Sequence, residues 1–185
     1  MPDMSQTPWD QFTLDLDLDT KVSPNFTISE LIKSETAQRH DIDNRFESVD
    51  HLRHAVYLAR NVLQPVRETF GPLSPNSVYR SQALERALKR KPDSWISSSQ
   101  HAFGQACDIE VYSLSTLEFA TWVKDNLTFD QLILECYNPE KGRNAGWVHV
   151  SLKPPGSSQN RGQILSYIKN AQNKWIYVDG LQETA

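Results

Sequence analysis

The sequence contains little cysteine, no excess of positive charge and no long apolar run. Cys107 and Cys136 are its two cysteines, too few for a disulfide framework in a chain of 185 residues. Both lie in apolar runs, so we expect buried, free thiols. Asp and Glu total 23 against 19 for Lys and Arg, which leaves a formal net charge of −4. Because there is no basic footprint, no nucleic-acid partner is predicted.

Segments that could enter or cross a membrane are missing as well. The longest apolar stretches, such as residues 129–137, fall far short of the roughly 20 residues that a spanning helix needs. Residues 1–12 have neither the basic start nor the apolar centre of a secretory signal. We therefore expect a protein with no membrane span, synthesised in the cytoplasm without a Sec signal.

What is present is the composition of one globular domain. Hydrophobic residues make up 38% of the chain, and its length is sufficient for a single core. Residues 1–24 are acidic and irregular, so we assign them to an N-terminal arm that precedes a domain over residues 25–185. Within the arm, residues 12–18 alternate between apolar and polar, mostly acidic, side chains, as a half-buried strand or a solvated mobile arm would.

After residue 25 the spacing of apolar residues predicts helices first and strands later. The strongest helix pattern runs through residues 47–71, where Pro65 predicts a kink or a boundary near residue 64. The strand patterns that follow, with one helix between them, favour a single α+β domain with a mainly antiparallel sheet flanked by helices. The other predicted elements are helices over 28–38, 82–90, 115–127 and 163–172, and strands over 76–81, 106–112, 129–137, 147–153 and 174–179.

Three polar residues interrupt strands at positions where a buried face is expected. Asp108, Glu135 and His149 each lie on the less apolar face of a different predicted strand. A buried carboxylate or imidazole is costly unless it is paired or bound to a metal. With His101, at the start of the strand over 106–112, the set becomes two histidines, an aspartate and a glutamate that could converge on one spot.

This set of side chains fits metal-assisted hydrolysis. Two histidines and one carboxylate, with water in the fourth position, make an open zinc site, and an unligated glutamate can move the proton of that water. Arg80, at the end of a predicted strand, could hold a substrate carboxylate with a bidentate fork. The spacing of His101 and Asp108 alone is not specific, so the alternative of hydrogen-bonded structural polar residues stays open at this point.

Four motifs in a fixed order resemble the zinc D-Ala-D-Ala carboxypeptidase family, in its branch of phage and bacterial cell-wall peptidases. The resemblance covers about residues 24–178. It implies a hedgehog/D-Ala-D-Ala peptidase-type fold, a Zn²⁺ cofactor and a peptidoglycan stem peptide as substrate. The motifs are "YRS" (79–81), "SSQHAFGQACDIE" (98–110), "FDQLILE" (129–135) and "WVHVS" (147–151).

Carried over residue by residue, the resemblance assigns the ligands and part of the substrate site. His101, Asp108 and His149 match the family's zinc ligands. Arg80 matches an arginine that binds the substrate and polarises its carbonyl, so it is predicted to be both catalytic and substrate-binding. Ser99 matches a serine two residues before the first ligand and is also assigned to substrate binding.

The catalytic base departs from the family pattern. Several members carry a glutamate three residues before the last ligand, and that position is Gly146 here. The related hedgehog domain has a Phe-Asp-x4-Glu motif instead, which residues 129–135 match, so Glu135 is predicted to be the general base. The alternative is that Glu135 only orients a ligand or caps the sheet. Trp147 is predicted to form a wall of the substrate cleft, the alternative being plain packing.

The resemblance therefore implies a zinc metallopeptidase that hydrolyses peptide bonds of peptidoglycan stem peptides. It leaves open whether the enzyme is a D,D-carboxypeptidase or an endopeptidase of the endolysin type. We expect a monomer that acts at the cell wall, either after release through a holin or as a virion component. The alternative is a catalytically inactive, zinc-stabilised binding or structural module of the same fold.

Overall fold

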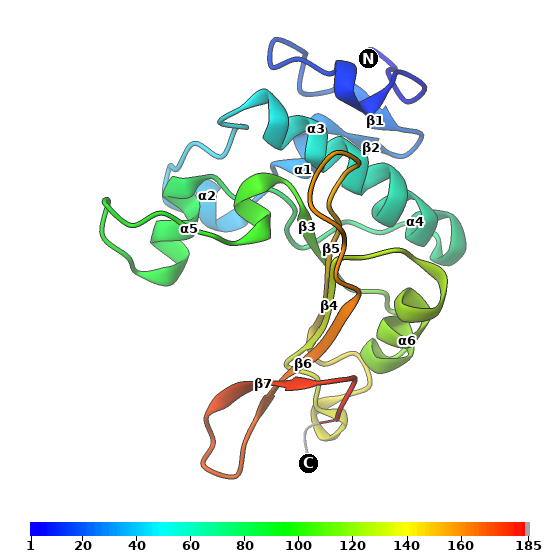
Figure 1. Cartoon of the computed structure of the whole chain (residues 1–185), viewed down its shortest axis with the longest axis vertical. Coiled ribbons are helices and arrows are strands. Elements are labelled where there is room, and N and C mark those ends of the chain that lie inside the picture. Colours follow the sequence, from blue (N-terminus) through cyan, green and yellow to red (C-terminus); the bar gives the residue numbers. More distant parts are fainter. Residues whose placement is uncertain (184–185) are drawn as a thin grey trace.

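A five-stranded mixed sheet forms the centre of the domain, with the strand order β3-β5-β4-β6-β7 (Figure 1). It is seen in a computed structural model that describes residues 1–183. Three of the four strand pairs are antiparallel, while β4 and β6 run parallel. The predicted α+β domain with a mainly antiparallel sheet is confirmed. The strands are β3 (Ala106–Ile109), β4 (Gln131–Glu135), β5 (Trp147–Ser151), β6 (Gln163–Lys169) and β7 (Trp175–Asp179).

Helices cover one face of this sheet. α3 (Val49–Leu58) continues through a π-helical turn (Ala59–Leu63) into α4 (Gln64–Phe70), and α6 (Thr116–Asn126) packs against β4 and β5. The boundary expected near residue 64 is confirmed, because the widened turn ends just before Pro65, which lacks an amide hydrogen. The strand residues that face the helices are fully apolar and buried: Cys107, Ile109, Leu132, Leu134, Val148 and Val150.

The opposite face of the sheet carries polar side chains. In the β3–β5 ladder Asp108 lies directly opposite His149, and in the β4–β5 ladder Glu135 lies opposite Trp147. Because side chains alternate along a strand, these four residues project from the same face, away from α3 and α6. The sheet thus separates an apolar core from a polar surface built by the same strands.

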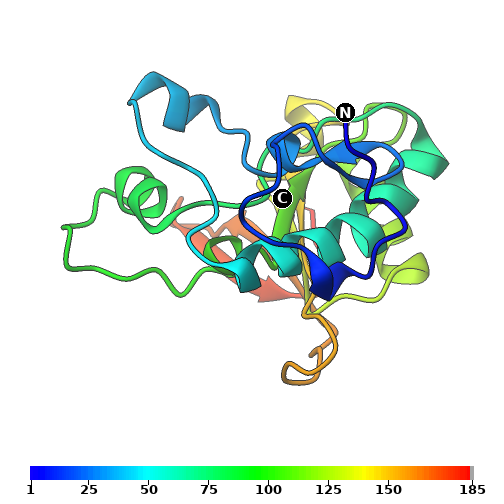
Figure 2. The same ribbon diagram turned by 90° about the horizontal axis from the view of Figure 1, so that it is seen from above.

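Residues 1–24 lie along the helices. Figure 2 shows this segment in dark blue beside α3, and Phe12 within it is fully buried. The Arg60 guanidinium donates hydrogen bonds to the carbonyl oxygens of Met4 (2.8 Å), Thr7 (2.6 Å) and Val22 (2.7 Å). A small sheet of β1 (Lys21–Ser23) and β2 (Phe26–Thr27) follows. The domain boundary at residue 24 stays a prediction.

Several predicted elements are wrong. The helix over 163–172 is strand β6, whose short apolar run pairs with both β4 and β7. The strand over 12–18 is a series of turns, in which Leu14 (51%) and Leu18 (46%) are exposed, because no strand within residues 1–183 pairs with it. The strand over 76–81 is reduced to one bridge between Ser77 and Asp108.

The remaining helices follow the sequence pattern more closely. The helix expected over 28–38 is divided into α1 (Ile28–Leu31) and α2 (Glu35–Arg39), because the Ser34 hydroxyl caps a new helix by accepting a bond from the Ala37 amide (3.2 Å). α5 (Gln82–Lys89) and α6 lie where they were predicted. No helix among residues 1–183 is long and apolar enough to cross a membrane.

Gly104 should be much less tolerant of a side chain than Gly156. Both have positive φ (+69° and +87°), but an added Cβ at Gly104 would lie 2.2 Å from the His51 carbonyl oxygen, whereas at Gly156 nothing lies within 4 Å. We expect Gly156→Ala to cost about 1 kcal/mol for the backbone conformation alone, and Gly104→Ala about 1–3 kcal/mol more for the steric overlap. Urea unfolding measures both, and equal losses would contradict this account of residue 104.

Candidate metal centre

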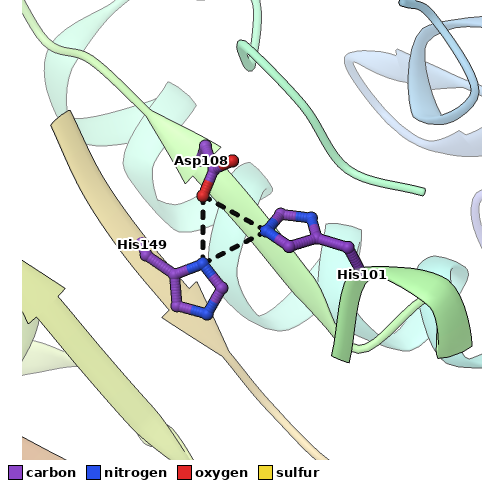
Figure 3. A group of neighbouring side chains, drawn as sticks. All are labelled: His101, Asp108 and His149. Atoms are coloured by element: carbon purple, nitrogen blue, oxygen red, sulfur yellow. Dashed lines mark hydrogen bonds and ion pairs between the residues drawn. The ribbon is translucent and has the colours of Figure 1, made fainter. Parts of the chain in front are cut away.

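Three buried side chains, from His101, Asp108 and His149, converge on one point of the polar face (Figure 3). His101 Nε2 lies 3.1 Å from His149 Nδ1, and both nitrogens face Asp108 Oδ1, at 3.2 Å and 3.0 Å. The three residues are 2%, 7% and 8% exposed, in chain order. The structure therefore brings together all three residues predicted as ligands.

Backbone geometry accounts for the convergence. Asp108 and His149 are register partners on adjacent antiparallel strands, so their side chains are neighbours on one face. His101 comes from a 3-10 turn (Gln100–Phe103) that ends at Gly104, which has a left-handed backbone. Gly104 allows the close turn between His101 and Asp108, because its φ is positive and its backbone lies against the His51 carbonyl oxygen, where a side chain would not fit.

The donor set fits a divalent zinc ion. His101 Nδ1 lies 2.7 Å from the Val78 carbonyl oxygen, so Nδ1 carries the proton and Nε2 directs its lone pair at the other two residues. Burial lowers the pKa of His101, which favours this neutral form. Tetrahedral zinc with ligand bonds of about 2.0–2.1 Å separates its ligand atoms by about 3.3 Å. The separations observed here, 3.0–3.2 Å, are close to that value.

Asp108 is ionised in this setting. Burial alone would raise the pKa of its carboxyl group, but without a metal ion the imidazoles of His101 and His149, when they carry the extra proton, hold it well below its usual range by charge and by hydrogen bonds. Its second oxygen, Oδ2, accepts a hydrogen bond from Arg80 Nη2 (2.5 Å). The two oxygens of Asp108 therefore have different partners: Oδ1 faces the histidines, and Oδ2 faces the guanidinium.

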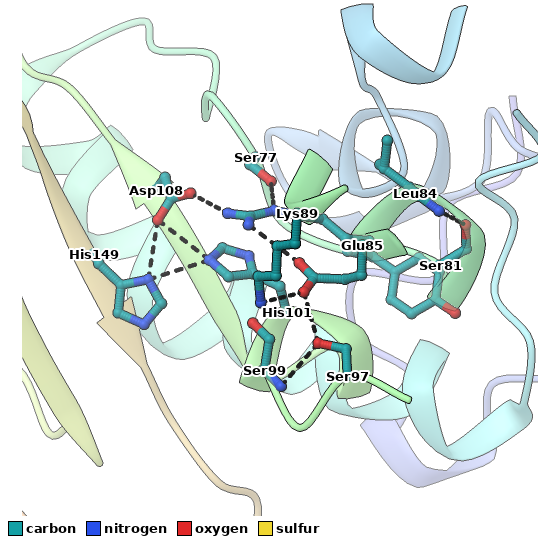
Figure 4. Close-up of polar contacts among 12 residues, drawn as sticks. Ser77, Ser81, Leu84, Glu85, Lys89, Ser97, Ser99, His101, Asp108 and His149 are labelled. Carbon is teal, nitrogen blue, oxygen red and sulfur yellow. Dashed lines mark hydrogen bonds and ion pairs between the residues drawn. The ribbon is translucent and has the colours of Figure 1, made fainter. Parts of the chain in front are cut away.

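Hydrogen bonds fix Arg80 on three sides, and their acceptors Ser77, Glu85 and Asp108 are labelled in Figure 4. Besides Asp108, it donates from Nε to the Ser77 hydroxyl (2.8 Å) and from Nη1 to Glu85 Oε1 (3.2 Å). Its side chain is only 19% exposed. The structure therefore places Arg80 behind a candidate ligand, where it orients the carboxylate. Its predicted contact with the substrate stays a prediction.

Glu85 belongs to the same network, although its sequence position does not predict a role in the site. Its side chain is 0% exposed and accepts bonds from Lys89 Nζ (2.6 Å) and the Ser97 hydroxyl (2.6 Å) as well as Arg80. Burial would raise its pKa, but Lys89, Ser97 and Arg80 together lower it. One feature of the sequence could have indicated its burial, namely that Glu85 follows Leu84 on the side of α5 that is buried.

The remaining predicted site residues line one cleft of about 700 Å³, together with the three candidate ligands. They are Arg80, Ser99, Glu135 and Trp147. The Glu135 carboxylate accepts no hydrogen bond from any residue in the described part of the chain (1–183), and burial raises its pKa. Glu135 lies one alternation along the sheet from His149, across the β4–β5 ladder. The structure thus places it in the cleft and not in the core.

Gly146 explains why a glutamate cannot occupy the family's usual position. Its φ is +74°, and an added Cβ would lie 2.1 Å from the carbonyl oxygen of Glu135. A side chain at residue 146 would therefore push apart the turn that joins β4 to β5. The same close approach brings the end of β4, with Glu135, next to the start of β5.

The two cysteines take no part in the cluster. Both are free thiols. Cys107 is buried on the helix-covered face, which confirms the prediction of a buried thiol there. Cys136 is only partly buried, so the prediction of a buried thiol is wrong there, because it lies just past the end of β4 with a positive φ of +57°.

Asp130 ties the loop over residues 152–162 to the cleft. The loop projects from the domain in orange in Figure 2. The Asp130 carboxylate is 0% exposed and accepts bonds from Arg161 Nη2 (2.5 Å), Lys153 Nζ (2.9 Å) and Gln100 Nε2 (3.1 Å). Gln100 precedes His101, so Asp130 braces the turn that carries this candidate ligand.

Comparison with protein-family models matches residues 24–151 to the family described as Peptidase M15. The matched range contains every predicted site residue, from Arg80 to His149. Among curated proteins, no match is found.

Zinc should bind to this cluster and stabilise the fold. We expect one equivalent of zinc in the purified chain, and a stabilisation of about 2.7 kcal/mol when free zinc reaches a hundred times its Kd. Asp108→Asn and His149→Ala should lose both effects, because each removes a ligand. Elemental analysis and thermal unfolding with and without a chelator measure them. His54→Ala, a histidine outside the cluster, is the control, and zinc retained in the two ligand variants would contradict the assignment.

Asp130 should make folding stability sensitive to acid. Burial opposes its ionisation, but Arg161 and Lys153 hold the pKa of its carboxyl group well below the unfolded value of about 3.9. Its contribution is therefore complete above about pH 5 and is lost as the pH falls below about 4. Asp130→Asn should cost roughly 3 kcal/mol at pH 7, and less at pH 3, because the loss becomes complete only when the pH falls below the low pKa of the folded state.

The matched control for this measurement is Asp125→Asn, a change of the same kind at a largely exposed carboxylate. Its effect on the free energy of unfolding should be small at both pH values. If Asp130→Asn lowers the free energy of unfolding as much at pH 3 as at pH 7, the ion pairs of Asp130 are not the source of its stabilisation.

Proposed function

The chain belongs to the Peptidase M15 family, the zinc D-Ala-D-Ala carboxypeptidase family, and from this premise we propose that it is a zinc-dependent peptidase that hydrolyses peptidoglycan stem peptides. The observation that carries the proposal is the convergence of His101, Asp108 and His149 in a cleft that also holds Glu135. A structural zinc site is closed by four protein ligands, whereas three ligands beside an unligated carboxylate are typical of catalysis.

His101, Asp108 and His149 would hold the ion. A bound zinc ion would supply a Lewis acid, which polarises a carbonyl group and lowers the pKa of bound water, so that the water can lose a proton and attack near neutral pH. The protein's own contribution is to fix the three donors before the ion arrives. Val78 sets the tautomer of His101, and Arg80 holds the rear oxygen of Asp108.

Glu135 is the residue that we propose moves the protons. Its carboxylate lines the cleft and has no hydrogen-bond partner in the described chain, so it is free to accept a proton from the attacking water. Burial raises the pKa of Glu135, which brings it nearer to the range where one group can act as both base and acid. It would then pass that proton to the departing amine.

Substrate binding is proposed for Arg80, Ser99 and Trp147. All three line the cleft with the candidate ligands. Trp147 is directly opposite Glu135 in the sheet and only partly buried, so it can form one wall beside the reacting bond. Arg80 would contribute through any N–H group not used by Asp108, Glu85 and Ser77.

An inactive, zinc-stabilised module is the competing function. It would be favoured by a Glu135 that points into the core, and the position of Glu135 in the cleft supports the peptidase instead. We propose that the enzyme acts as a monomer at the cell wall, after release through a holin or as part of a virion.

Glu135→Gln should separate catalysis from metal binding. The change keeps the size of the side chain but removes the base, so we expect the turnover of peptidoglycan fragments to fall about 10²–10⁴-fold with zinc content unchanged. Product release from purified sacculi, followed by mass spectrometry, measures the rate.

Glu140→Gln provides the matched control, because this exposed glutamate lies a few residues further on, outside the cleft. It should hydrolyse sacculi at the wild-type rate. Full activity in Glu135→Gln would remove Glu135 from the mechanism, and a zinc-loaded wild type without any product would refute the peptidase.

A further inference from the structure

A row of aromatic side chains extends from the cleft along the last two strands. Tyr167 on β6 and Tyr177 on β7 are cross-strand partners, and the centroids of their rings lie 4.6 Å apart. Tyr167 also stacks on Trp175, with the centroids 5.2 Å apart and an angle of 19° between the ring planes. Because side chains alternate along a strand, Trp175 and Tyr177 lie on one face of β7. We call these three residues the aromatic row.

The aromatic row lies on the same face of the sheet as the metal centre. Tyr167 is the register partner of Glu135 in the parallel β4–β6 pair, and Tyr177 lines the cleft together with Glu135 and His149. Burial and the charge of Glu135 both raise the pKa of Tyr177. The row therefore begins beside the proposed base and continues outwards to Trp175, on the edge strand β7 that Figure 1 shows in red.

The aromatic row is open to solvent. Trp175 is 42% exposed and Tyr177 is 58% exposed. Packing of the rings across the two strands stabilises the β6–β7 hairpin, but this role does not require that the rings stay exposed. Large apolar side chains that are exposed side by side mark a binding surface. The row therefore has the properties of a site that another molecule covers.

The aromatic row also lies outside the part of the chain that the family model matches. The match ends at residue 151, the last residue of β5, whereas β6 and β7 occupy residues 163–179. The three candidate ligands and Glu135 all lie inside the matched range. The family match therefore accounts for the metal centre but not for the row beside it.

The chemistry of the row suits a chain of sugars. A sugar ring has flat faces of C–H groups, which pack on aromatic rings, and hydroxyl and amide groups at its edge, which need polar partners. Tyrosine and tryptophan combine an apolar ring with a polar tip. The strand register adds Lys169 and Asp179 to the same face, and Lys169 Nζ lies 5.4 Å from the centre of the Trp175 ring. The row thus offers ring faces for stacking and a border of polar groups of both charges.

We propose that the aromatic row binds the glycan strand of peptidoglycan, a chain of N-acetylated sugars, while a stem peptide attached to this strand occupies the cleft. The proposal rests on the proposed function and adds a second part of the substrate to it. The position of the row supports the choice of ligand, because a stem peptide in the cleft brings its attached sugar chain to the rim. Tyr177 lies at that rim, and the row leads away from it.

Binding of glycan strands that carry no peptide tests the inference without any cleavage. Titration calorimetry with the full chain measures the Kd of strands from which the stem peptides have been removed. Tyr177→Leu keeps an apolar side chain but removes the ring, so it should raise the Kd about tenfold, the loss expected for one stacking contact. Tyr177→Phe keeps the ring and should bind as the wild type does. Trp175→Leu is a second variant with the expectation of Tyr177→Leu.

Tyr112→Leu is the matched control, because Tyr112 is 77% exposed and lies outside the aromatic row. It should bind glycan strands with the wild-type Kd. A wild type that does not bind the strands would overturn the inference, as would an unchanged Kd in both Tyr177→Leu and Trp175→Leu. Self-association of the chain that Tyr177→Leu abolishes, without binding of glycan, would assign the row to a second copy and overturn the inference as well.

Hydrolysis separates this inference from the proposed function. The zinc-loaded chain is given one stem peptide in two forms, attached to glycan strands and free. Relative to the free peptide, Tyr177→Leu should lower kcat/KM for the attached peptide about tenfold, mainly through KM. An equal loss on both substrates would overturn the inference and leave the peptidase proposal intact. If the wild type cleaves neither substrate but binds glycan strands through the row, the peptidase proposal fails and the glycan site is supported.

Discussion

The register that sets Asp108 opposite His149 is the constraint on which the rest of the site depends. It buries a carboxylate next to two imidazoles, and an ionised carboxylate there is tolerated only if its charge is compensated. A series of ion pairs compensates the charge: Arg80 pairs with Asp108, the buried Glu85 pairs with Arg80, and Lys89 pairs with Glu85. Charges alternate along this chain of contacts, so the removal of one member leaves a buried neighbour unpaired.

Much of the site could be predicted from sequence because strands alternate with a period of two. Asp108 and His149 stood out as polar residues at regular positions in apolar strands, and the structure brings both together with His101. Glu85 could not be found in this way, since a glutamate on an amphipathic helix is usually solvated, and only tertiary packing shows that α5 buries it. Arg80 lies before α5 and Glu85 lies within it, so neither helix nor strand periodicity predicts that the two side chains are in contact.

The errors in the fold have related causes. The apolar run at residues 163–169 is too short for its periodicity to distinguish a helix from a strand. It forms a strand because β4 and β7 pair with it on both sides. Residues 12–18 have strand alternation, but no strand in the described part of the chain pairs with them. Gly146 was read only as a missing glutamate, whereas its positive φ and its approach to Glu135 show that no side chain fits there. The proposed base, Glu135, lies instead on the adjacent strand β4, which the sheet holds beside the cluster.

Anomalous diffraction from a crystal of the zinc-loaded protein, recorded at the zinc absorption edge, would locate the ion. We expect one strong peak about 2.0–2.2 Å from His101 Nε2, Asp108 Oδ1 and His149 Nδ1, with the Glu135 carboxylate facing it across the cleft and not bound to it. A peak at another set of residues, or none at these three, would contradict the assignment of the metal centre.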